Sequence, residues 1–180
     1  MAYIDLGVDE QEAPGIIGPM RYRPETAQHL NGLAELLLRA PHSLPAGERE
    51  LIAAYVSGLN ECNFCCSSHS AFAAEQLDAG MTLVERVRAD PGTAPISPKL
   101  RALLKIAAAV QRSGRAVTPE LIEAARAEGA TDVELHDTVL IAAAFCMFNR
   151  YVDGLGTFAP GTPEAYTPMA KRIVAEGYGV

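Results

Sequence analysis

The chemistry and the fold of this chain centre on one stretch: Glu50-Leu-Ile-Ala-Ala-Tyr-Val-Ser-Gly-Leu-Asn-Glu-Cys-Asn-Phe-Cys-Cys-Ser-Ser-His69. It holds three of the four cysteines of the chain and one of its four histidines. Two of these cysteines form the pair Cys62-x-x-Cys65. In an intracellular protein, such a pair is either redox-active or half of a metal site. We therefore expect the function to reside in this stretch.

The residues around the cysteines predict a helix that runs from an N-cap at Asn60 to about Asp78. A short polar side chain such as asparagine accepts hydrogen bonds from the free N–H groups of a first helical turn. Cys62 would then lie in that turn, where the helix dipole favours a thiolate. The neighbouring charge of Glu61 opposes this effect. By position alone, Cys62 is thus the expected low-pKa thiol.

Helical spacing predicts that Cys62, Cys65 and His69 share one face, at positions i, i+3 and i+7. Cys66 would lie on an adjacent stripe. A histidine so placed can take a proton from a thiol or give one to a leaving group. Glu50 lies in an apolar run before the turn, and it could orient the imidazole if its own helix folds back beside the cysteine helix.

Two other interpretations remain for these residues. Buried cysteines are often simple core residues, and this fits Cys66 and Cys146. Zinc accepts thiolate and imidazole ligands, so Cys62, Cys65 and His69 could bind it with a fourth ligand such as Glu50 or Cys66. The spacing Cys-x2-Cys-x3-His within one helix is uncommon for structural zinc. Redox chemistry is therefore the leading hypothesis, with no metal expected.

The constellation Glu50-x11-Cys62-x2-Cys65-x3-His69 resembles the signature of the AhpD-like alkyl hydroperoxidases, in the carboxymuconolactone decarboxylase superfamily. Flanking segments resemble the branch known as peroxidase-related enzymes, and these segments are Pro14–Ile16, Glu48–Ile52, Val56–Asn60 and Asn149–Gly156. The similarity covers most of the chain. The four-residue constellation is specific, and the flanks support it.

The resemblance implies an all-α, cofactor-free enzyme that reduces hydroperoxides. In it, Cys65 matches the cysteine that attacks peroxide, and Cys62 matches the resolving cysteine. The two form a disulfide that a thiol or disulfide-reductase partner reduces. His69 and Glu50 match the proton-relay positions. The resemblance also implies a homo-oligomer, a dimer, trimer or hexamer. Alternatives on the same fold are a disulfide oxidoreductase and a lactone decarboxylase or isomerase, although the latter needs no dithiol.

Phe64 departs from the pattern that the resemblance implies. The best-known members carry a second histidine directly before the second cysteine, and this chain has phenylalanine there. One proton carrier of the pattern is therefore missing. The peroxidase efficiency and the substrate expected from the resemblance are both affected by this difference.

Composition sets broader limits. The chain has 180 residues, 49% of them hydrophobic and 21% charged, with a net charge of −7. This predicts one folded domain that does not bind nucleic acid or anionic membranes nonspecifically. The N-terminus lacks the features of a signal peptide, and the longest apolar run, 139–148, is too short to span a bilayer. We therefore expect a cytoplasmic location.

Helix signals divide the rest of the chain into an N-terminal extended arm, residues 1–23, and one helical domain, residues 24–180. Ser97-Pro98 and Thr131-x-x-Glu134 are clear helix starts, the second a capping box. The sequence Leu-Ile-Ala-Ala occurs at 51–54 and at 140–143, which hints at a degenerate two-half repeat.

Three polar residues of interest lie outside the central stretch. We expect His42 to be a solvated loop residue and His136 to lie near an exposed helix start. Arg150 is expected at the surface or in an interface, although its neighbourhood in the family-like segment raises its chance of lining the site.

Overall fold

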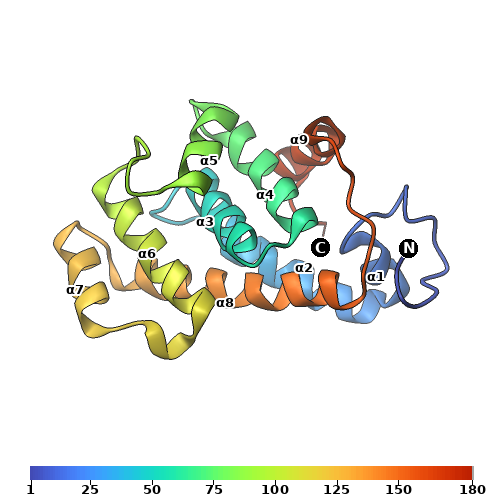
Figure 1. Cartoon of the computed structure of the whole chain (residues 1–180), viewed down its shortest axis with the longest axis horizontal. Coiled ribbons are helices and arrows are strands. Elements are labelled where there is room, and N and C mark those ends of the chain that lie inside the picture. The colour runs from blue at the N-terminus through green and yellow to red at the C-terminus, as the bar shows by residue number, and fades with distance from the viewer. Residues whose placement is uncertain (180) are drawn as a thin grey trace.

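A computed structural model describes residues 1–179, and within this range the chain is helical without β-strands (Figure 1). This confirms the all-α prediction. The α-helices are α1 (Ile17–Tyr22), α2 (Pro24–Leu38), α3 (Ala46–Leu59), α4 (Asn63–Gln76), α5 (Gly80–Ala89), α6 (Pro98–Arg112), α7 (Pro119–Ala127), α8 (Asp132–Gly154) and α9 (Thr167–Glu176). Two short 3₁₀ turns, η1 (Gly114–Ala116) and η2 (Pro163–Tyr166), complete them.

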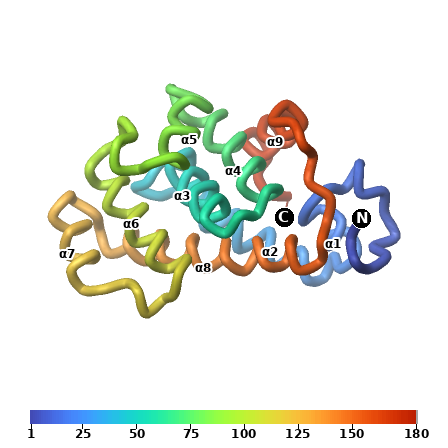
Figure 2. Tube along the Cα trace, viewed as in Figure 1, coloured from blue at the N-terminus to red at the C-terminus, as the bar shows by residue number. Residues whose placement is uncertain are grey.

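Helix α3 is the centre of the molecule. It packs against α4, α5, α6, α8 and α2, and Leu51, Ile52, Ala53, Ala54 and Val56 on it are fully buried. A helix that is apolar nearly all round must be enclosed by other helices. The long helix α8 runs beneath α3 along the length of the molecule, with α6 and α7 at one end and α1 and α9 at the other (Figure 2). Both described chain ends lie near α1 and α9.

Local capping signals account for two of the helix starts. Ser97 accepts a hydrogen bond from the Leu100 N–H at the start of α6. Thr131 and Glu134 form the reciprocal capping box of α8. Both were predicted from the sequence, because a cap depends only on residues within one turn of each other.

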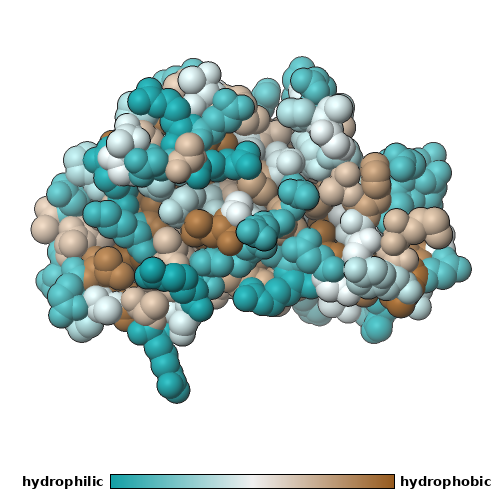
Figure 3. Space-filling view, viewed as in Figure 1, coloured by the Kyte–Doolittle hydropathy of each residue, from teal (hydrophilic) through white to brown (hydrophobic). Residues whose placement is uncertain are grey.

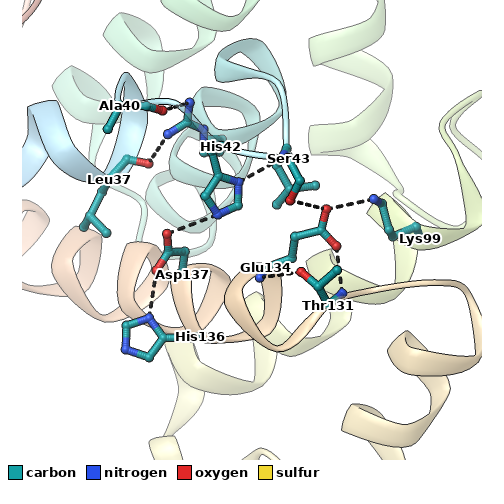
Figure 4. A network of polar contacts seen from close by, with 11 residues as sticks. Leu37, Ala40, His42, Ser43, Lys99, Thr131, Glu134, His136 and Asp137 are labelled. Carbon is teal, nitrogen blue, oxygen red and sulfur yellow. Dashed lines mark hydrogen bonds and ion pairs between the residues drawn. The ribbon is translucent and has the colours of Figure 1, made fainter.

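The Glu134 carboxylate does more than cap α8. It also accepts hydrogen bonds from Lys99 and Ser43, so it ties the starts of α6 and α8 to the loop before α3 (Figure 4). Burial alone would raise the pKa of Glu134, but the hydrogen bonds from the Thr131 N–H, Lys99 and Ser43 outweigh burial and lower that pKa to about 2. The carboxylate is therefore ionised wherever the protein is folded near neutral pH.

His42 was expected to be a solvated loop residue, and this is wrong. Its side chain is 7% exposed, its Nδ1 accepts the Leu44 N–H, and its Nε2 lies 3.2 Å from the Asp137 carboxylate (Figure 4). The loop folds onto α8, which no local sequence signal indicates. His136 is exposed as expected and contacts the other Asp137 oxygen.

The segment 1–23 was expected to be an extended arm, but its last part forms the short helix α1. Pro19 does not interrupt this helix, because the N–H of a third helical residue has no partner within the helix. The segment packs on its own chain: the Gly15 N–H donates to the Phe158 carbonyl, and Glu10 accepts the Phe158 N–H. The N-terminal segment thus forms part of the wall of the site.

The visible surface carries no single large apolar face. In Figure 3, hydrophobic residues occur as small separate patches among polar ones. Among the residues that the structure describes, no helix has both the length and the apolar character needed to cross a membrane.

Candidate active site

Helices α3 and α4 form the antiparallel hairpin that creates the site. A turn at 60–62 joins them and has the hydrogen bonds of a Schellman motif: the Cys62 N–H donates to the Ser57 carbonyl, and the Glu61 N–H donates to the Gly58 carbonyl. Glu61 takes a left-handed conformation there, with φ of 59°. The hairpin confirms the fold-back that was required to bring Glu50 beside the cysteine helix.

The start of the cysteine helix differs from the expectation. Asn60 is the C-cap of α3, and Cys62 itself is the N-cap of α4. The Asn60 side chain instead donates to Asn149 on α8, and Asn149 donates to Ser57. These two amides, of which Asn149 is buried, hold the turn against α8 and thereby place Cys62. Asparagine suits both a helix start and a helix end, which explains the wrong assignment.

The two cysteines of the pair lie in different surroundings. Cys62 is fully buried. Cys65 is also nearly buried, but it lines a cavity of about 1040 Å³, whereas Cys62 does not. A hydrogen bond with Cys65, burial, and the charge that Cys65 would carry all raise the pKa of the Cys62 thiol. The expectation of a low pKa at Cys62 is therefore wrong, because the N-cap position is enclosed instead of open to water.

Cys66 lies behind the pair, buried against Gly58 of α3. Burial raises the pKa of the Cys66 thiol, which suits a core residue. Cys146 on α8 is partly buried, and its sulfur is 3.5 Å from the Asn60 amide nitrogen. Neither cysteine lines the cavity.

His69 lies one turn beyond Cys65 on α4, and it lines the same cavity. Its Nδ1 is 2.6 Å from Oε2 of Glu50, which is fully buried on α3. The ring is also held edge-on by Phe145, with centroids 4.5 Å apart, and by Phe72. The imidazole is therefore fixed in orientation, and Nε2 is the nitrogen left for chemistry.

The neighbour of Glu50 in the sequence, Arg49, ties α3 to the end of α2. Arg49 is buried, and its guanidinium donates to the Leu37 and Ala40 carbonyls at the end of α2. These bonds satisfy carbonyls that have no partner within α2, and they tie α3 to α2. The segment of α3 that carries Glu50 is thereby held against the end of α2.

Sequence reasoning missed one member of this group, Tyr178. Its hydroxyl donates to Oε1 of Glu50 at 2.6 Å, so both oxygens of the carboxylate are engaged. Tyr178 follows α9, 128 residues after Glu50. No spacing rule links residues so far apart, and only its place between two glycines distinguishes it in the sequence. The remaining residue considered, Arg150, is exposed and donates to the Cys146 carbonyl, away from the cavity lining.

The cavity beside Cys65 and His69 is mainly apolar. Its walls come from the N-terminal segment, α1, α2, α4, α8 and α9. Four phenylalanines line it: Phe64, Phe72, Phe145 and Phe148. Within residues 1–179, no group of three or more His, Cys, Asp or Glu side chains is arranged to hold a metal ion.

This fold and site define a class: an all-helical protein with a buried dithiol beside a carboxylate–imidazole pair. Residues 24–86, which include all four of these side chains, match the carboxymuconolactone decarboxylase family. No curated protein matches the chain at a significant level.

Two solved structures share the fold. One is described as an alkylhydroperoxidase AhpD core, an uncharacterized peroxidase-related protein from Ralstonia eutropha JMP134. It is 25% identical with a TM-score of 0.77, over 90% of this chain and 85% of its own. The other, an uncharacterized peroxidase-related protein from Silicibacter sp. TM1040, is 24% identical with a TM-score of 0.75, over 82% of this chain and 77% of its own. The chain thus resembles the carboxymuconolactone decarboxylase family over residues 24–86, and its fold resembles that of structures described as AhpD core and peroxidase-related.

Proposed function

We propose that the protein is a thiol peroxidase that reduces organic hydroperoxides through a Cys65–Cys62 disulfide cycle. One observation carries the proposal: Cys65 and His69 open onto the same cavity, while Cys62 is buried directly behind Cys65. The cysteine that meets the substrate and the cysteine that resolves the product are thereby distinguished. The likeness to proteins described as peroxidase-related supports the same reaction class.

In the first step, His69 Nε2 takes the proton of the Cys65 thiol, and the thiolate attacks one oxygen of the O–O bond. That bond breaks, the Cys65 sulfur becomes a sulfenic acid, and the alkoxide leaves as an alcohol with the proton from His69. In the second step, the Cys62 sulfur attacks the sulfenic sulfur, and a disulfide and water form. A dithiol donor then reduces the disulfide.

The roles of Glu50 and Cys62 follow from their surroundings. Glu50 holds the Nδ1 side of the imidazole and stabilises the imidazolium that forms after proton uptake. The raised pKa of Cys62 keeps this thiol protonated until the sulfenic acid is present, so it does not compete for the peroxide.

The cavity supports a substrate with a sizeable apolar body. A volume of about 1040 Å³ with four phenylalanines in its walls is large for hydrogen peroxide but fits a drug-sized organic molecule. Phe64 forms part of this wall at the position where a second histidine was expected. We expect the kcat/KM for cumene hydroperoxide to exceed that for hydrogen peroxide by about tenfold or more, since apolar contact contributes about 1–3 kcal/mol per group.

The test is a single-turnover experiment on the reduced protein. One equivalent of cumene hydroperoxide is added, free thiols are quenched by alkylation, and the sites are mapped by mass spectrometry. We expect a Cys62–Cys65 disulfide in the wild type, no reaction in Cys65→Ser, and a sulfenic acid at Cys65 that dimedone traps in Cys62→Ser.

Cys66→Ser and Cys146→Ser are the matched controls, because these thiols are also partly or fully buried but lie outside the cavity lining. Both should form the disulfide at the wild-type rate. A wild-type protein that keeps all its thiols reduced, or disulfide formation that survives Cys65→Ser, would overturn the mechanism.

A further inference from the structure

The segment after α9 brings a phenol to the centre of the site. The chain turns at Gly177, with φ of +83°, and a Cβ there would lie 2.6 Å from Oε2 of Glu35. Glycine is favoured there by the positive φ, and a larger residue would also displace the Glu35 carboxylate. The turn directs Tyr178 back between α2 and α4, and its side chain lines the cavity.

Two contacts anchor this segment to α2. The Tyr178 N–H donates to Oε2 of Glu35 at 2.9 Å, and the Arg39 guanidinium donates to the Val174 carbonyl at 2.8 Å. Glu35 on α2 and Arg39 at its C-cap lie four residues apart, so together they fix the direction of the segment as well as its position. These two hydrogen bonds therefore hold the Tyr178 phenol in place.

The Tyr178 hydroxyl and the His69 imidazole each contact one oxygen of the Glu50 carboxylate. Oε1 accepts from the phenol and Oε2 contacts Nδ1 of the imidazole, both at 2.6 Å. The two rings lie nearly parallel, 17° apart. Burial first, and then the charge of Glu50, raise the pKa of Tyr178 well above its usual value, so the phenol keeps its proton and donates it to the carboxylate.

We propose that Tyr178 is a positioning residue that fixes the Glu50 carboxylate and weakens the stabilisation that this carboxylate gives to protonated His69. This proposal rests on the relay of the proposed function. A hydrogen bond from the phenol draws charge from the carboxylate, which then stabilises the imidazolium less strongly. His69 consequently releases its proton to the leaving alkoxide more readily than it would beside an unshared carboxylate.

The charged and titratable groups around this pair come from four elements. Glu50 faces His69 from α3, Cys65 shares α4 with it, and Tyr178 faces it from the C-terminal segment. From α2, Glu35 and Arg39 act on the phenol with opposite sign. From α8, the ring contact is the uncharged Phe145.

The first test follows the ring Nδ1 proton of His69 by NMR, because this proton lies in the contact with Oε2 of Glu50. The background is Cys62→Ser/Cys65→Ser, which removes both thiols of the pair. We expect Tyr178→Phe to move this proton resonance downfield, because a carboxylate that has lost the hydrogen bond from the phenol is a stronger acceptor for the imidazole N–H. An unchanged resonance, or one that moves upfield, would overturn the proposal.

Tyr55→Phe is the matched control. It removes a phenol oxygen from a partly buried tyrosine on α3 whose ring lies outside the cavity lining. It should leave the Nδ1 proton resonance of His69 unchanged. If Tyr178→Phe does not fold, Gly177→Ala supplies the same test, because it strains the turn that places the phenol while keeping the phenol and every charge. It should then move the Nδ1 resonance in the same direction, and no change there would refute the role of the segment.

The second readout is kinetic and uses the chain with all its thiols. We expect Tyr178→Phe to lower kcat for cumene hydroperoxide about tenfold with little change in KM, since the ring that lines the cavity is retained. A change confined to KM would mean that Tyr178 only binds substrate. The NMR measurement needs no turnover, so a failure of the peroxidase reaction in the wild type is distinguishable from a failure of this proposal.

Discussion

Replacing Glu61 with glycine should stabilise the protein. Glu61 is the non-glycine residue with positive φ among the described residues, and its side chain is exposed. The left-handed conformation costs an L-residue about 1–2 kcal/mol, which glycine does not incur. The greater freedom of glycine in the unfolded chain offsets about 0.5–1 kcal/mol of that gain. The net expectation is a rise of about 0.5–1 kcal/mol in the free energy of unfolding.

Urea denaturation followed by far-UV circular dichroism measures this change, and a Tm increase of about 1–4 °C should accompany it. Glu85→Gly is the matched control, because it removes the same exposed side chain from the middle of α5. There glycine should cost about 1 kcal/mol relative to a good helix former. If Glu61→Gly lowers stability as Glu85→Gly does, the turn that presents Cys62 is not strained and the reasoning fails.

Two further predictions concern other parts of the fold. Gly15→Ala should destabilise the protein by about 1–3 kcal/mol, since a Cβ there would lie 2.1 Å from the Phe64 ring and φ is +58°. Chemical denaturation measures this change, and an unchanged free energy of unfolding would contradict the prediction. Glu134→Gln should remove about 2–3 kcal/mol of stability at neutral pH. Because the pKa of Glu134 is lowered to about 2 in the folded state, this contribution is present above about pH 5 and is lost as the pH falls toward 2. Unfolding of both proteins across that range should converge at low pH, and a constant difference would argue against the assignment.

The sequence predicted those parts of the molecule that local chemistry determines. Ser97 and Thr131 cap their helices as expected, because both partners of a cap lie within one turn. Cys65 and His69 share a face for the same reason, since helical spacing alone aligns them. Glu50 joined them once the α3–α4 hairpin brought its helix alongside.

Features that depend on distant parts of the chain were not predictable in this way. His42 is buried because the loop before α3 docks on α8, and Tyr178 reaches Glu50 because α2 holds the C-terminal segment. The pKa of Cys62 was expected to fall and instead rises, since position in a helix indicates the dipole but neither the hydrogen bond with Cys65 nor the burial. For His42 and Tyr178, the deciding contact lies far away in the sequence.

The position of Cys62 at the N-cap of α4 has a consequence for the oxidised protein. Its side chain makes no capping hydrogen bond in the reduced form, and Cys65 is the third helical residue after it. A capping box joins these same two positions through side-chain hydrogen bonds. A Cys62–Cys65 disulfide would thus be its covalent counterpart, which closes the first turn of α4 without unwinding it. The oxidised and reduced proteins should therefore have the same backbone and the same far-UV spectrum, and a reductant would have to recognise the sulfur atoms themselves.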